Sequence, residues 1–164
     1  MRYLLIAALL ASPLAAEELV FDAGATSSCV AAQDTEPAML MCIGRAAEAC
    51  MELTEGGWTT YGMVSCIGAE LSYWDAELNI AYKAAVADAK AVDAENAEYG
   101  ASAPSVEDAL RAMQRGWIAY RDGLCSFERS LWGGGTGGGP AGAGCLMHET
   151  ARQTLVLRRG VGLE

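Results

Sequence analysis

The segment SVEDALRAMQRGWIAYRDGLCSFERSL, residues 105–131, carries the pattern that decides the fold. Its apolar residues recur at alternating steps of three and four without a gap, which is the spacing of one face of an amphipathic α-helix. Ser105 stands at the N-cap position, with Asp108 three residues later and Pro104 just before it. The segment therefore predicts a long helix that begins after Ser105. Its apolar face consists of Val106, Leu110, Met113, Trp117, Tyr120, Leu124, Phe127 and Leu131.

Two further helical patterns flank this segment. From Ile67 to Val92 the same rhythm holds with one gap at Asp88. Because the connection around residues 100–102 is short, we expect these two helices to form an antiparallel hairpin. A shorter helix is expected from about Cys145 to Arg158.

The stretch GGGTGGGPAGAG, residues 133–144, separates the second and third of these helices. Glycine at this density does not hold a helix or strand by itself, so the stretch predicts a mobile surface loop. No strand pattern precedes it and no Gly-Lys-Ser/Thr follows it, which argues against a phosphate-binding loop.

The first residues have the features of a secretory signal peptide. Met1–Arg2 is a short positive start, residues 3–10 are an apolar run, and cleavage is expected after Ala16. The apolar run is too short to span a bilayer, and no later segment is long and apolar enough to do so. No cysteine lies near the cut, which argues against a lipid anchor. We therefore expect residues 17–164 to be a periplasmic or secreted protein.

The formal net charge of −10 limits the choice of partner. A chain this acidic is not expected to bind nucleic acid, because phosphate contacts require a positive surface. It suits a cationic protein partner. The alternative is that the acidity only keeps an exported protein soluble.

An even number of cysteines in a small exported chain predicts a disulfide framework. No C-x-x-C occurs and His148 is the only histidine, so neither a zinc site nor any cofactor is expected. Residues 36–53 read as one helix, and a shorter helix is expected at about 27–33. Two turns of one helix separate Cys42 from Cys50 by roughly 12 Å, which is too far for a bond. We therefore favour sequential pairing of Cys29 with Cys42, Cys50 with Cys66, and Cys125 with Cys145.

These patterns predict an all-α fold: a disulfide-stapled helical hairpin, a short C-terminal helix and an extra N-terminal helical segment. The expected organisation is a signal peptide at 1–16, an N-terminal cysteine-containing segment at 17–62, and a helical domain at 63–164.

A polar stripe follows the edge of the apolar face, with Gln114 and Arg121 seven residues apart. Arg121 should pair with an acid on the preceding helix, because a guanidinium lying on a core favours a bidentate carboxylate. We interpret the stripe as a structural network that fixes the register of the two helices; the alternative is contact with a ligand. Its members are Gln114, Trp117, Tyr120, Arg121, Asn79 and Glu77.

In combination, several motifs resemble the family of exported domains named after the LprI lysozyme inhibitor. They are Cys66, AELNIAY at 76–82, QRGWIAYRDGLC at 114–125, GGGT at 133–136, and Cys145 followed by Thr150. The resemblance covers about Cys66 to Leu157. One position departs from it, since Gln153 stands where the family usually has an arginine. The resemblance implies an exported protein that binds and inhibits lysozyme.

No catalytic arrangement stands out in the sequence, so we expect no enzyme activity. His148 is alone and the cysteines are expected to be oxidised, which leaves no nucleophile beside a base. The alternatives are an envelope interaction or structural module with another protein partner, and a peptidoglycan-active hydrolase that uses two carboxylates. For a cationic lysozyme we favour an acidic face near the hairpin connection over the glycine stretch, because ordering many glycines costs entropy and an acidic helix face steers a cationic partner. That face consists of Glu95, Glu98, Glu107 and Asp108.

Overall fold

A computed structural model describes residues 18–98, 100, 102 and 104–160, and the expected signal peptide lies outside them. The described residues form helices and no strands, which confirms the all-α class. The helices are α1 (Gly24–Ala31), α2 (Glu36–Leu40), α3 (Arg45–Leu53), α4 (Thr60–Glu98), α5 (Val106–Ser130) and α6 (Gly138–Arg158). None of these helices is both long enough and apolar enough to cross a membrane.

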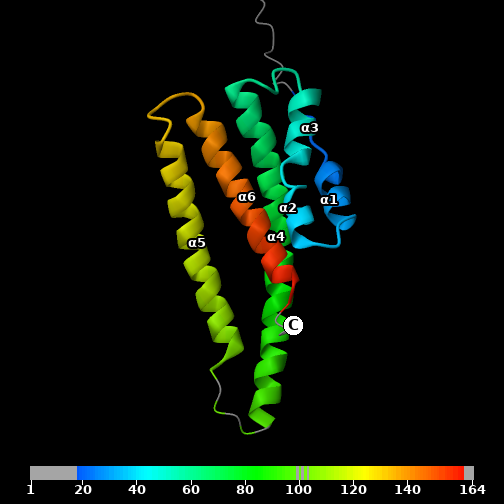
Figure 1. The fold of residues 1–164 in the computed structure, drawn as a ribbon, viewed down its shortest axis with the longest axis vertical. Coiled ribbons are helices and arrows are strands. Elements are labelled where there is room, and N and C mark those ends of the chain that lie inside the picture. The colour runs from blue at the N-terminus through cyan, green and yellow to red at the C-terminus, as the bar shows by residue number, and fades with distance from the viewer. Residues whose placement is uncertain (1–17, 99, 101, 103, 161–164) are drawn as a thin grey trace, which may run out of the picture.

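The body of the molecule consists of α4, α5 and α6 (Figure 1). The hairpin of α4 and α5 is confirmed, and α6 packs against both of its helices. On the other side α3 packs against α4, and α1 packs against α2 and α3. We call the end at the α4–α5 connection the hairpin tip. We call the opposite end, with the α3–α4 turn at 54–59, the start of α4 and the α5–α6 turn at 131–137, the open end. The 39 residues of α4 span roughly 58 Å, so the two ends are far apart.

Three disulfides join segments that are neighbours in sequence, and the sequential pairing is confirmed. Cys29 bonds to Cys42 within the N-terminal segment, and Cys50 bonds α3 to Cys66 of α4. Cys125 of α5 bonds to Cys145 of α6. This last bond closes a loop with a sequence separation of 20, for which the chain-entropy model gives about 3 kcal/mol of stabilisation.

The N-terminal segment is not one helix over residues 36–53, as the sequence suggested. The chain breaks between α2 and α3 at Gly44, whose φ of 95° lies in the left-handed region that glycine adopts without strain. The shorter helix expected at about 27–33 is present as α1, three residues earlier at its start. The break directs the N–H groups at the start of α3, which have no partner within that helix, toward α4.

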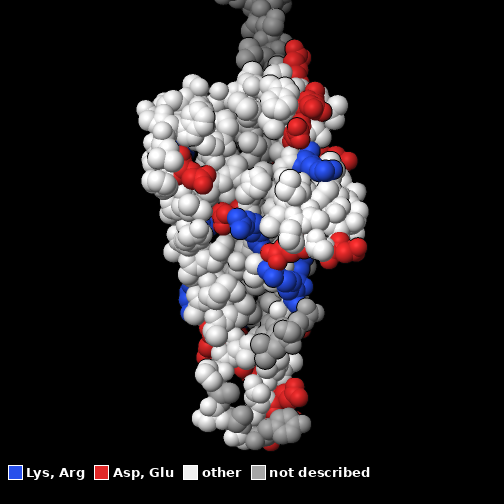
Figure 2. Space-filling view, viewed as in Figure 1, with Lys and Arg blue, Asp and Glu red and all other residues white. Residues whose placement is uncertain are grey.

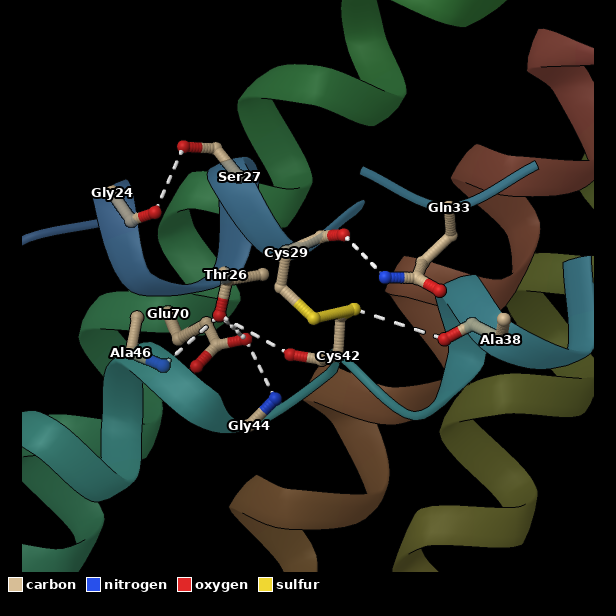
Figure 3. The surroundings of a disulfide bond; sticks show 10 residues. All are labelled: Gly24, Thr26, Ser27, Cys29, Gln33, Ala38, Cys42, Gly44, Ala46 and Glu70. Carbon is tan, nitrogen blue, oxygen red and sulfur yellow. Dashed lines mark hydrogen bonds between the residues drawn. A yellow bond between two sulfur atoms is a disulfide. The ribbon is translucent and has the colours of Figure 1, made fainter. Parts of the chain in front are cut away.

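The buried carboxylate of Glu70 on α4 accepts hydrogen bonds from those N–H groups, and Figure 3 shows the one from Gly44. Glu70 has no solvent exposure, and its oxygens accept hydrogen bonds from the backbone N–H of Gly44 at 2.8 Å and of Ala47 at 2.7 Å. The Thr26 hydroxyl and the Trp74 indole also donate to it, at 2.9 and 3.1 Å. A negative group at a helix N-terminus is also favoured by the helix dipole. Glu70 thus joins α1, α3 and α4 at one point.

Packing of the N-terminal segment continues from this carboxylate into the main core. Trp74 lies at 0% exposure in a cluster with Val30 and Ile43 from the N-terminal segment and Met147 and Leu155 from α6. A second, smaller cluster of Leu78, Ala81, Ala85 and Leu157 lies toward the hairpin tip. The small side chains in this second cluster let α4 and α6 approach closely.

The glycine stretch at 133–144 is not a mobile loop, because α6 already begins at Gly138. The third helix is therefore longer than the expected Cys145–Arg158. A Cβ on Gly142 would lie 3.4 Å from the side chain of Arg129, and one on Gly139 would lie 3.2 Å from that of Val64. Glycine is used here for close helix packing, and the nearby disulfide at Cys145 holds the helix in place.

The expected apolar face of α5 is not buried along its whole length. The residues of α5 that are buried are Gln114 and Cys125, which lie beside that face. Tyr120, Phe127 and Leu131 are exposed. The reason is that α6 covers the polar edge of α5, and no described element covers the rest of its apolar face.

The first prediction concerns the buried carboxylate. Glu70→Ala should lower the free energy of unfolding by about 3 kcal/mol or more, because each buried donor left unsatisfied costs about 1–3 kcal/mol. Glu70→Gln should cost less but still measurably, because an amide accepts through one oxygen only. Urea denaturation of the oxidised protein measures both.

Glu52→Gln is the matched control, because Glu52 is exposed on α3. If Glu70→Ala and Glu52→Gln change stability equally, the carboxylate does not hold the N-terminal segment in place.

Candidate functional site

Four of the six residues of the expected polar network lie in three separate groups, and Asn79 and Tyr120 belong to none of them. The first contains Gln114, which is buried between α5 and α6 and accepts a hydrogen bond from Gln153 at 2.8 Å. Gln153 is itself buried, at 7% exposure. Gln153 stands where the family usually has an arginine. Here the hydrogen bond between two uncharged amides joins α5 to α6 in place of an arginine contact.

The second group surrounds Arg121, whose acidic partner is not on α4 as expected. Its Nε donates to the neighbouring Asp122 at 2.9 Å, and a terminal nitrogen donates to Thr150 of α6 at 3.4 Å. The guanidinium lies 4.9 Å from the ring centroid of Trp117. The side chain is 19% exposed, so it anchors α5 to α6 at the edge of the interface.

The third group joins the C-terminal end of α6 to α4. Glu77 pairs with Arg158, and this guanidinium lies 6.0 Å from the Trp74 ring. Burial, followed by the charge of Glu77, raises the pKa of the nearby Tyr73. Asn79 donates only within its own helix, to the carbonyl of Asp75. Together with the exposed Tyr120, Asn79 therefore stands apart from the network.

The hairpin tip is closed by a carboxylate that the sequence did not single out. Asp93 of α4 accepts from the Ser105 hydroxyl at 2.7 Å and from the N–H groups of Val106 and Glu107 at 2.7 and 3.1 Å. Ser105 also caps α5 as predicted, accepting from the N–H of Asp108. These bonds lower the pKa of Asp93, the Ser105 bond most strongly.

The expected acidic face at the tip is partly neutralised. Glu107 lies 2.7 Å from Arg111 and 3.7 Å from Lys90. Glu95, Glu98 and Asp108 are exposed. The face therefore presents three exposed carboxylates and a fourth that is paired with two cations.

The open end is different in character, because it combines exposed apolar side chains with unpaired acids. Figure 2 shows acidic side chains along one upper edge and an almost uncharged surface over the rest of that end. In the described part of the chain, no salt bridge joins the exposed acids there, Glu48, Glu52, Glu55 and Glu128, to a cation. The exposed apolar side chains at this end are Leu53, Trp58, Tyr61, Phe127, Leu131 and Trp132.

A groove of about 530 Å³ opens between α4 and α5 next to this surface, with α6 as its floor. Val64 lines it from α4, Asp122 and Arg129 from α5, and Gly139 and Leu146 from α6. The groove is apolar at its floor and polar along the α5 wall.

Residues suited to metal binding or nucleophilic catalysis are not gathered anywhere in the described ranges. No group of three or more His, Cys, Asp or Glu side chains there could hold a metal ion. His148 is exposed on α6, and all six cysteines are in disulfides.

The chain was compared with known proteins. The sequence profile of the family described as "Lysozyme inhibitor LprI" matches residues 50–157. The chain belongs to the LprI lysozyme inhibitor family. An uncharacterized protein from Rhizobium meliloti (strain 1021) is 37% identical over 84 residues, which are 51% of this chain and 60% of that relative. No solved structure matches the chain.

The LprI match covers the three-helix body with both ends and leaves out the first two helices. It begins at Cys50 of α3 and ends at Leu157 of α6, so it includes two of the three disulfides. The Cys29–Cys42 bond and α1 lie before it. Glu70, which lies inside the matched region, holds this added segment.

Sequence reasoning missed the roles of Glu70, Asp93 and Gln153. Glu70 shares the face of α4 that carries Trp74, four residues later, and an acid on an apolar face signals a buried partner. Asp93 and Gln153 carry no comparable signal, because neither was recognised as a polar residue that interrupts an apolar face.

The second prediction concerns Arg121. Arg121→Ala should lower the free energy of unfolding by about 1–2 kcal/mol, through loss of the Thr150 bond and the Trp117 contact. Arg121→Lys should recover only part of this, because an ammonium does not stack flat on an indole ring. Urea denaturation tests both variants. A loss above about 3 kcal/mol would instead indicate a buried acid partner.

The third prediction uses the lowered pKa of Asp93. A carboxyl with a lowered pKa stabilises the fold above its ordinary value of about 4, and the stabilisation disappears as pH falls through its folded pKa. The stability difference between the parent and Asp93→Asn should therefore be constant above about pH 5 and shrink below it. Ser105→Ala, which removes the strongest cause, should reduce this pH dependence. A difference that is flat down to pH 2 would contradict the assignment.

Proposed function

We propose that this chain is an exported, non-catalytic protein that binds a lysozyme and inhibits it. The observation that carries the proposal is the family match over residues 50–157, which takes in α4, α5 and α6 and both ends of the bundle. Three disulfides support export, because such bonds persist in oxidising compartments.

Charge supports a cationic partner. The chain carries a formal net charge of −10, and many lysozymes are strongly cationic. Opposite net charges raise the association rate and make it depend on ionic strength. Exposed acids lie at the hairpin tip and at the open end, and others, such as Asp34 and Asp75, lie elsewhere on the described surface.

A catalytic role has less support from the side chains. Glu70 is the carboxyl group with the apolar surroundings that would suit an acid catalyst, but it is fully buried and its oxygens are occupied by four donors. The acids at both ends lie on open surface. A hydrolase that uses two carboxylates on either side of a glycosidic bond needs a cleft between them.

A second candidate function is an envelope interaction module for another protein. The exposed apolar side chains at the open end favour it, because large exposed apolar patches mark sites of protein contact. This candidate differs from the first in the identity of the partner.

The fourth prediction separates the candidates in one assay. Lysis of a cell-wall suspension is followed by turbidity with the chain alone and with a cationic lysozyme. The proposal predicts no lysis by the chain alone and slower lysis by the enzyme when the chain is present. Inhibition should weaken as ionic strength rises from about 0.05 to about 0.5 M, because screening shortens the range of the attraction.

Lysis by the chain alone would show a hydrolase. The absence of any effect on a panel of lysozymes would leave the interaction module as the function.

A further inference from the structure

Exposed apolar side chains are concentrated at the open end of the bundle. Tyr61 at the start of α4 is 83% exposed, and Leu131 and Trp132 in the α5–α6 turn are 68% and 54% exposed. Among the described residues from 81 to 112, which adjoin the hairpin tip, no large apolar side chain is exposed; the nearest are Ile80 at 63% and Met113 at 40%. Protein-binding hot spots are enriched in tryptophan and tyrosine, and among the described residues several exposed side chains of this kind gather at the open end.

The α5–α6 turn is ordered before any partner arrives. The ring of Trp132 lies against Gly137, where a Cβ would overlap it. Backbone hydrogen bonds join Gly135 to Trp132 at 2.8 Å and Gly138 to Gly135 at 3.1 Å. The Cys125–Cys145 bond ties the two helices that carry the turn.

This order weakens the entropic reason for preferring the hairpin tip, although the acids there would still attract a cationic partner. The entropy lost on binding disfavours the glycine stretch only if residues 133–144 form a mobile loop. Residues from Gly138 onward are helical, so binding has fewer glycines left to order. Preorganised elements bind with a smaller entropic loss.

Charge at the open end also fits a lysozyme. The chain from Ser130 to Met147 contains no charged residue, whereas exposed acids lie around it at Glu52, Glu55 and Glu128. A glycosidase of the lysozyme type has two carboxylates in its cleft. An uncharged turn adds no like charge beside them, while the surrounding acids face the cationic outer surface of the enzyme.

We infer that the open end, and not the hairpin tip, is the surface that inhibits the lysozyme, with the Leu131–Trp132 turn entering the cleft. The inference rests on the proposed function. Tyr61 and Trp58 contact the rim of the cleft, and the groove beside Val64 and Arg129 receives a protruding side chain of the enzyme.

The test measures inhibition constants of the full exported chain against a panel of cationic lysozymes that includes the hen egg-white enzyme. The double variant Leu131→Ser, Trp132→Ser should weaken inhibition at least about 30-fold, as loss of a central anchor does. Tyr61→Arg should weaken it comparably, since it places a cation against a cationic partner. Because Tyr61 is highly exposed, the Tyr61→Arg variant should keep the parental melting temperature. Weaker inhibition by this variant therefore tests the open end even if the double variant in the turn is destabilised.

Two controls are matched to these variants. Ile80→Ser removes an apolar side chain that is 63% exposed on α4 but lies away from the open end. A quadruple variant with Glu95→Gln, Glu98→Gln, Glu107→Gln and Asp108→Asn neutralises the tip. Both should change inhibition less than about 3-fold, since neither removes a central anchor.

The outcomes separate the inference from the function on which it rests. If the parent inhibits, the open-end variants keep its inhibition constant and the tip variant loses inhibition, the surface assignment is overturned and the function stands. If the parent inhibits no lysozyme of the panel, both the function and the assignment are wrong.

Discussion

One buried carboxylate, Glu70, holds the N-terminal segment to the bundle. A carboxylate without solvent is strongly unfavourable unless hydrogen-bonded, and four donors from α1, α3 and α4 satisfy this one. Two of these donors are N–H groups at the start of α3, which become available because the chain turns at Gly44. The position of α3 is therefore set by hydrogen bonds to a single side chain of α4, and the Cys50–Cys66 bond holds its other end.

Fixing α3 has a consequence at the open end, since α3 brings Glu52, Leu53 and the turn with Trp58 beside the start of α4. The other half of that end depends on the Cys125–Cys145 bond, which holds the glycine-rich start of α6 against α5. Anchors and acids from three helices thus form one preorganised surface. Gly139 and Gly142 contribute to this surface by letting the helices approach closely. Their flexibility matters less.

Periodicity in the sequence was sufficient to predict the long hairpin and the cap at Ser105, because these depend on local spacing. The sequential cysteine pairing was also predicted correctly, although the single helix over residues 36–53 that supported it is broken at Gly44. Periodicity failed where partners are distant in the chain. The spacing of apolar residues in α5 predicts an amphipathic helix but does not say which element packs against it. The exposure of Tyr120 and Phe127 could therefore not be predicted. The same limit hid the partner of Glu70 and the Gln114–Gln153 pair. For the candidate site, composition located the acids but not the open end, because that surface joins residues more than 70 positions apart.

Hydrogen–deuterium exchange of the chain, with and without a saturating amount of an inhibited lysozyme, tests the central claim most directly. Amide exchange reports burial of a backbone segment without altering any side chain. The account predicts slower exchange in the complex at residues 53–64 and 131–139, with unchanged exchange at 93–98 and 104–108. Protection confined to the latter two ranges would contradict it, because the contact would then lie at the hairpin tip.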